Sequence, residues 1–130
     1  MINKFKKIYL LGAGGYGKQL FEILKKNEIA KSIIFVDDKY KLNLNTFLKK
    51  KKLRFIITIG SPKIREKIYL KSLKTDLQYQ TVILNNKNIY TTKIDKGCVV
   101  EPNVLITNNV VIGIGNFILA GSVIGHDVHV

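Results

Sequence analysis

A glycine-rich loop near the start of the chain has the spacing of a phosphate-binding turn. Gly12, Gly14 and Gly17 fit the pattern G-x-G-x-x-G, and Gly15 adds a fourth glycine. Glycines at this spacing let the backbone turn tightly and approach a phosphate. The N–H groups and the dipole of a helix N-terminus then favour the negative charge. The loop therefore predicts a site for a phosphorylated ligand.

An acidic pair follows the loop at the distance that nucleotide-binding sites use. Asp37 and Asp38 lie 20 and 21 residues beyond Gly17, directly after an apolar run. A carboxylate at the end of that strand can accept hydrogen bonds from a ribose or a base. The alternative is that the glycines serve only close packing of a helix on a sheet, and that the aspartates belong to a solvated turn.

Composition limits the other chemistries. Cys98 is the single cysteine, which excludes an intrachain disulfide, and His126 and His129 lie too far from it for metal-ligand spacing. We therefore predict no metal site. The net charge of +13 favours an acidic partner, which can be nucleic acid, an anionic membrane surface or a phosphorylated small molecule. The cluster at Lys49–Lys52 lacks interleaved aromatic rings, so we interpret it as a solvated helix end and expect no nucleic-acid binding.

Short apolar, β-favouring runs alternate with helical patterns in the first part of the chain. The expected strands are residues 7–11, 32–36, 55–59 and, last, 77–84. One helix is predicted after the glycine loop, and another is predicted to begin at Pro62 with Ser61 as its N-cap. Strands separated by helices form a parallel sheet. Residues 1–85 are therefore predicted to be a Rossmann-like α/β domain.

From Ile94 onward the apolar residues recur every sixth position. The members of this register are Ile94, Val100, Ile106, Ile112, Ile118, Ile124 and Val130. Three residues after each of the first six stands a type that tolerates left-handed backbone, namely Gly97, Asn103, Asn109, Gly115, Gly121 and Asp127. A period of six is typical of a left-handed parallel β-helix, in which three hexads make one triangular coil.

We therefore predict that residues 86–130 form about two coils of such a β-helix. Ordinary Val/Ile-rich strands are the alternative, but the turn residues keep the same period as the apolar ones, which favours the β-helix. Solenoids generally need about three repeats and a cap. We accordingly expect the β-helix to continue beyond Val130 or to be completed by other subunits.

Four segments in this order resemble a known enzyme family. They are IYLLGAGGYGKQLFEIL, IIFVDD, FIITIGSPKIREKI and GSVIGHDV. The chain is similar to the bacterial sialic-acid O-acetyltransferases and UDP-4-amino-sugar N-acetyltransferases of the NeuD and PglD type. In that family the N-terminal domain holds the nucleotide part of a nucleotide sugar and acetyl-CoA lies along the β-helix. The resemblance further implies a homotrimer in which a histidine near the start of the solenoid acts as base.

The resemblance can be carried over to individual residues. It implies substrate contacts at Gly12, Gly14, Gly15, Gly17, Asp37 or Asp38, Gly60 and Ser61. The base falls on His126, whose imidazole Asp127 can orient, and His129 is the competing candidate. Three positions depart from the family pattern. Tyr16 and Gly17 stand where many relatives have His-Ala, and Gly125 stands where some relatives have a carboxylate.

The function that the resemblance implies is acetyl-CoA-dependent transfer to a nucleotide-activated amino sugar or sialic acid in surface-glycan synthesis. A second hypothesis is a non-catalytic nucleotide-sugar-binding or assembly module, because the later coils that would hold the pantetheine arm are missing from this sequence. No apolar run approaches the roughly 20 residues of a membrane span, so we expect a cytoplasmic protein.

Overall fold

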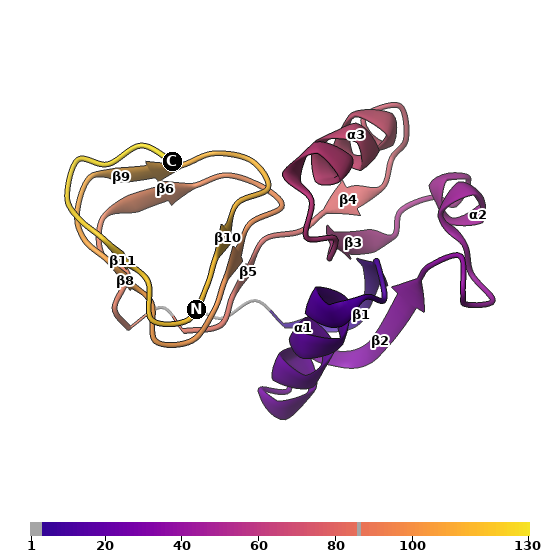
Figure 1. The fold of residues 1–130 in the computed structure, drawn as a ribbon, viewed down its shortest axis with the longest axis horizontal. Helices are drawn as coiled ribbons and strands as arrows, with labels where there is room; N and C mark the ends of the chain where they lie inside the picture. Colours follow the sequence, from indigo (N-terminus) through magenta and orange to yellow (C-terminus); the bar gives the residue numbers. More distant parts are fainter. Residues whose placement is uncertain (1–3, 86) are drawn as a thin grey trace. The chain divides into compact units, whose positions relative to one another are not determined.

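The computed structural model describes residues 4–85 and 87–130 (Figure 1). These residues form two compact units, residues 4–79 and residues 80–130. The sequence placed the boundary after residue 85 and a single strand at 77–84. In the structure that segment is divided, because Gln78–Tyr79 pair with the preceding sheet whereas Val82–Ile83 pair with residues 99–100.

The first unit is a four-stranded parallel sheet with helices. Its elements in chain order are β1 (Phe5–Leu11), α1 (Gly15–Lys26), β2 (Ala30–Val36), α2 (Leu44–Leu48), β3 (Arg54–Ile57), α3 (Pro62–Ser72) and β4 (Gln78–Tyr79). The strand order is β2-β1-β3-β4. The chain therefore reverses its direction of winding between β1 and β3, and in open α/β sheets ligands bind at such a point, outside the carboxyl ends of the strands.

Successive side chains of β1 point to opposite faces of the sheet, and both faces are buried. Tyr9 and Leu11 join a buried cluster with Phe47 of α2 and Phe55 of β3. Residues on the other face of the strand, such as Leu10, are also fully buried, as expected for a parallel sheet covered on both faces. Ser61 caps α3 as predicted, with its hydroxyl accepting from the N–H of Ile64.

The second unit is a three-sided coil of short parallel strands, which Figure 1 shows nearly along its axis. Its strands are β5 (Val82–Ile83), β6 (Thr92–Ile94), β7 (Val99–Val100), β8 (Leu105–Ile106), β9 (Val110–Ile112), β10 (Phe117–Ile118) and β11 (Val123–Ile124). One side stacks β5, β7 and β10, the second β8 and β11, and the third β6 and β9. The predicted fold class, a Rossmann-like sheet followed by the first coils of a parallel β-helix, is confirmed.

The corners of this coil lie where the hexad pattern predicted them. All six predicted turn residues have positive φ angles, from 58° at Asn109 to 80° at Gly121. The register residues Val100, Ile106 and Ile112 between them are completely buried. Exposure rises toward the last coil and reaches 49% at Val130, because a register side chain is covered only where coils stack on both sides of it.

The β-helix core includes two residues that precede the predicted register. Ile83 and Ile89 pack against the same core as the register residues, and Ile89 bridges to Ile106 of β8. The step from Ile89 to Ile94 is five residues instead of six. The six-residue period that starts at Ile94 therefore does not continue toward the N-terminus. The side chains of Ile83 and Ile89 nevertheless lie in the same β-helix core.

None of the helices among residues 4–85 and 87–130 has the length and apolar character needed to cross a membrane. In the same residues no group of three or more histidine, cysteine or acidic side chains is arranged to hold a metal ion.

Candidate functional site

Packing against neighbouring backbone explains two of the loop glycines. Gly12 has a φ of 119°, and a Cβ atom there would lie 2.7 Å from a side-chain carbon of Ile59. A Cβ on Gly17 would lie 2.1 Å from the carbonyl oxygen of Gly12. That carbonyl also accepts a hydrogen bond from the Thr58 hydroxyl at 2.7 Å. Gly12 and Gly17 are thus required where α1 crosses β1 and β3, whether or not a ligand binds.

The other two loop glycines lie open. A Cβ on Gly14 or on Gly15 would meet nothing within 4 Å. Gly14 is the N-cap of α1 without a side-chain capping bond, and the first turn of α1 contains no acidic residue. A helix start with these properties favours an anion. Gly14 and Gly15 are therefore the glycines that a phosphate can approach.

Asp37 holds the glycine loop in place. One of its carboxylate oxygens accepts from the N–H of Ala13 at 2.9 Å, and the other accepts from the N–H of Lys39 at 3.1 Å. The bond from Ala13, followed by that from Lys39, lowers the pKa of the Asp37 carboxyl. Asp38 is exposed and makes no hydrogen bond or ion pair within the described part of the chain. Of the predicted acidic pair, Asp38 is the member that a ligand can use.

A small cavity lies at the carboxyl ends of β1, β2 and β3. Its volume is about 130 Å³, and its lining includes Gly12, Asp37, Asp38 and Ile59. Pockets for whole ligands usually measure about 300–1,000 Å³, so this cavity has room for only part of a nucleotide. Gly60 and Ser61 follow Ile59 without lining it. The backbone there is held by Arg65, whose guanidinium donates to the carbonyls of Ile59 and Gly60 at 2.9 Å each.

The role of Asp37 predicts a pH dependence of stability. Because its folded pKa lies below the ordinary value of about 3.9, its stabilisation is complete above that value and is lost as the pH falls through the lowered folded pKa. We expect Asp37→Asn to make the free energy of unfolding less dependent on pH below about pH 4. Urea denaturation between neutral pH and about pH 3 measures this. Asp38→Asn is the control, and equal pH dependence in Asp37→Asn and the wild-type chain would contradict the assignment.

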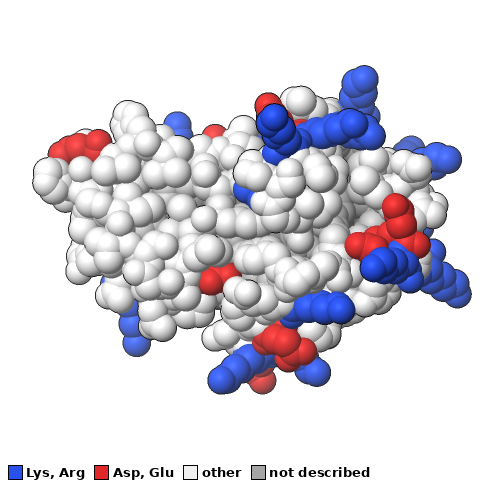
Figure 2. Space-filling model, viewed as in Figure 1, with Lys and Arg blue, Asp and Glu red and all other residues white. Residues whose placement is uncertain are grey.

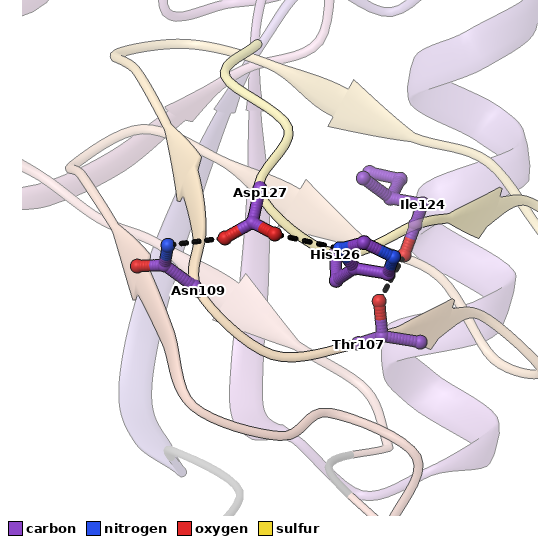
Figure 3. Close-up of polar contacts among 5 residues, drawn as sticks. All are labelled: Thr107, Asn109, Ile124, His126 and Asp127. Carbon is purple, nitrogen blue, oxygen red and sulfur yellow. Dashed lines mark hydrogen bonds and ion pairs between the residues drawn. The ribbon is translucent and has the colours of Figure 1, made fainter.

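The β-helix unit brings the predicted base and its orienting acid together (Figure 3). Nδ1 of His126 lies 2.6 Å from a carboxylate oxygen of Asp127. A carboxylate only accepts, so the contact places the imidazole proton on Nδ1 and leaves Nε2 as an acceptor. Both side chains are open to solvent, 75% and 60% exposed. An exposed imidazole with one ring nitrogen held by a carboxylate has the arrangement of a general base.

Two residues that sequence reasoning missed support this pair from the preceding coil. Asn109 donates its side-chain N–H to the second carboxylate oxygen of Asp127. This bond first, and the contact with His126 second, lower the pKa of the Asp127 carboxyl. Thr107 donates both its backbone N–H and its hydroxyl to the carbonyl of Ile124, at 3.0 and 3.2 Å. These bonds fix the chain just before His126.

The remaining candidate side chains have simpler environments. His129 bridges through its backbone to Val111, and its exposed imidazole makes no hydrogen bond among the residues that the structure describes. Cys98 is fully buried, its thiol lies 3.0 Å from the carbonyl of Gly113, and burial raises its pKa. A buried thiol of raised pKa is a poor nucleophile, so Cys98 is part of the β-helix core.

The net charge of the chain is confined to the α/β unit. Residues 4–79 contain 19 Lys and Arg against 6 Asp and Glu, whereas residues 80–130 contain three of each. On the face drawn in Figure 2 the basic side chains accordingly gather over the α/β unit. At the sheet's N-terminal edge, Lys6, Lys52 and Arg54 line a further hollow. The field of this unit therefore favours an anionic ligand.

Comparison with known proteins identifies the α/β unit. The family model described as the PglD N-terminal domain matches residues 7–72, which is 66 of the 130 residues. The chain belongs to the PglD N-terminal domain family. The matched segment contains the glycine loop, Asp37, Asp38, Gly60 and Ser61, whereas His126 and Asp127 lie outside it. A search of curated proteins found no significant match.

Solved structures share the fold of this PglD family member along nearly its whole length. The acetyltransferase domain of PglB from Neisseria gonorrhoeae, in complex with acetyl coenzyme A, matches with a TM-score of 0.84 and 18% identity over 95% of this chain and 66% of that domain. PerB from Caulobacter crescentus, in complex with CoA and GDP-perosamine, matches with a TM-score of 0.76 and 21% identity over 95% of this chain and 64% of PerB. The present chain thus spans about two thirds of the length of these two proteins.

Proposed function

We propose that this protein transfers an acetyl group from acetyl-CoA to a nucleotide-activated amino sugar or sialic acid. The observation that carries the proposal is the His126–Asp127 contact, which leaves Nε2 of an exposed imidazole free to accept a proton. It lies in a β-helix that follows a PglD N-terminal domain. An amine or hydroxyl can attack a thioester efficiently only if a base takes its proton.

In the proposed reaction, His126 accepts a proton from the sugar and later returns it to the leaving thiolate. Nε2 of His126 accepts the proton of the sugar N–H or O–H while that nitrogen or oxygen bonds to the thioester carbonyl carbon. Asp127 stabilises the imidazolium that forms. The tetrahedral intermediate then collapses, the carbon–sulfur bond breaks, and the imidazolium returns its proton to the departing thiolate as CoA-SH. Proton transfer of this kind contributes roughly 10²- to 10⁴-fold to a rate.

In this proposal the α/β unit holds the nucleotide part of the acceptor. Gly14 and Gly15 offer open backbone at the start of α1 to a phosphate, and Asp38 offers an exposed carboxylate to a ribose or base. Gly60 and Ser61 add backbone beside the cavity. The positive charge of this unit attracts a diphosphate or monophosphate ligand.

The names of the similar structures agree with this assignment. PglB is described as an acetyltransferase domain holding acetyl coenzyme A, and PerB holds CoA together with GDP-perosamine. A variant of the Caulobacter enzyme is described as a perosamine N-acetyltransferase. These names favour an amino group as the acceptor, with a hydroxyl as the alternative.

The second candidate is a nucleotide-sugar-binding module without transferase activity. It is favoured by the family match, which covers residues 7–72 of the α/β unit and none of the β-helix. Isothermal titration calorimetry with UDP-, GDP- and CMP-linked sugars and, separately, with acetyl-CoA distinguishes the two. A transferase binds a nucleotide sugar and acetyl-CoA, whereas the module binds only the nucleotide sugar. Binding of neither would contradict both candidates.

The resemblance also leads us to propose a homotrimer in the cytoplasm. Leu119 and Val123 on the β-helix unit are 50% and 70% exposed. A subunit surface would require that such exposed apolar side chains form a contiguous patch. Sedimentation equilibrium of the full chain measures the assembly directly.

A further inference from the structure

Asn109 and Asp127 occupy the same corner of successive coils. They are 18 residues apart in sequence, and their φ angles of 58° and 59° are nearly identical. The backbone N–H of Asp127 also donates to the carbonyl of Asn108 at 3.2 Å. The stacking of coils therefore places the Asn109 amide beside the Asp127 carboxylate, although nothing in the local sequence connects them.

The two oxygens of Asp127 have different partners. One accepts from the Asn109 side-chain N–H, and the other lies 2.6 Å from Nδ1 of His126. Figure 3 shows the three side chains in one row, with the carboxylate between the amide and the imidazole. Because both oxygens are engaged, rotation of the carboxylate would break one bond or the other.

Such an anchor matters because the pair is exposed to water. His126 and Asp127 are neighbours in sequence with side chains 75% and 60% exposed. An exposed contact between two such groups contributes little by itself, since water competes and each side chain must give up rotational freedom. A second bond that fixes the carboxylate lowers the entropy cost of forming the contact. It thereby increases the fraction of His126 that is in the Nδ1–H form.

We infer that Asn109 is a positioning residue for acetyl transfer, which holds Asp127 so that Asp127 holds His126 with Nε2 outward. The inference rests on the proposed function for its kinetic part only. The catalytic base would then depend on two successive coils, since Asn109 lies on the first and Asp127 and His126 lie on the second. Asn109 itself touches neither substrate nor coenzyme in this scheme.

Asn103 offers a matched control. It is also an exposed corner asparagine, with a φ of 62°. The residue stacked on it 18 positions later is Gly121, and its side chain makes no hydrogen bond among the residues described. Glycine tolerates positive φ, so Asn103→Gly and Asn109→Gly remove equivalent side chains from equivalent backbone without strain. Only Asn109→Gly removes an anchor from Asp127.

The kinetic test compares these two variants in the full chain. We expect Asn109→Gly to lower kcat for acetyl transfer roughly 10-fold, the lower limit of what outer-shell partners usually contribute, with KM nearly unchanged. Asn103→Gly should retain the wild-type kcat. Equal kcat in all three proteins would overturn the inference, and so would equal losses in the two variants, which would indicate a merely structural role.

A second readout is independent of turnover. Nitrogen-15 NMR reports which ring nitrogen of His126 carries the proton, and carbon-13 NMR follows the titration of the Asp127 carboxyl. Asn109→Gly should move the neutral imidazole toward the Nε2–H form and raise the pKa of Asp127, whose other charged neighbours are His126 and His129. Asn103→Gly should change neither. If the wild-type chain transfers no acetyl group, the proposed function fails while this experiment still decides the inference, and unchanged spectra in Asn109→Gly would overturn it.

Discussion

Replacing His126 by alanine is expected to lower kcat for acetyl transfer by about 10²- to 10⁴-fold. The variant loses the only group in the described β-helix unit whose ring nitrogen is oriented by a carboxylate. Nucleotide-sugar affinity should stay the same, because the loop glycines and Asp38 belong to the α/β unit. Steady-state release of CoA gives kcat and KM, and calorimetry gives the affinity.

His129→Ala is the matched control for this prediction. Its imidazole is also exposed and lies three residues from the first, but no carboxylate is bonded to it among the described residues. We expect its kcat to remain close to that of the wild type. A large loss in His129→Ala with little loss in His126→Ala would reassign the base to His129.

Gly17→Ala is expected to destabilise the α/β unit by about 3 kcal/mol or more, the range of severe core clashes. The new methyl carbon would lie 2.1 Å from the carbonyl oxygen of Gly12 and 3.3 Å from the Thr58 hydroxyl. The first of these atoms is backbone, so no flexible side chain can move aside. Urea denaturation followed by circular dichroism measures the loss.

Gly15→Ala separates packing from ligand binding in the same loop. A methyl group there meets nothing within 4 Å, and alanine at a helical position is at most about 1 kcal/mol more favourable than glycine. Stability should therefore hold or rise slightly, while affinity for a nucleotide sugar should fall because the methyl group occupies the approach of the phosphate. Unchanged affinity would indicate that Gly15 lies away from the ligand.

The periodicity of the β-helix made much of that unit predictable. Every corner residue from Gly97 to Asp127 has the expected positive φ, because a position that needs left-handed backbone restricts residue type strongly. Ile83 and Ile89, which precede the predicted register but pack in the same core, were missed for a physical reason. A β-helix tolerates a five-residue step between Ile89 and Ile94 as long as both side chains still point into its core. A search for apolar residues at a strict period of six stops at such a step.

The candidate site stays a prediction as a set of residues, and the structure adds what each of these residues contacts. The pattern G-x-G-x-x-G does not tell which glycines are crowded, and only coordinates show that Gly17 is and Gly15 is not. Asp37 and Asp38 look equivalent in sequence, yet the bond from Ala13 assigns Asp37 to the loop. Asn109 was missed because its partner is 18 residues away, a spacing that has meaning only once the coil is known to be three hexads long.

The most direct test of the proposed function is transfer of a radiolabelled acetyl group. The full chain is incubated with labelled acetyl-CoA and, in turn, with UDP-, GDP- and CMP-linked amino sugars and CMP-sialic acid, and the acceptor is separated and counted. We predict label in at least one nucleotide sugar, with the incorporation lost in His126→Ala and retained in His129→Ala. Equal incorporation by wild-type and His126→Ala protein, or no label in any of these acceptors, would contradict the account.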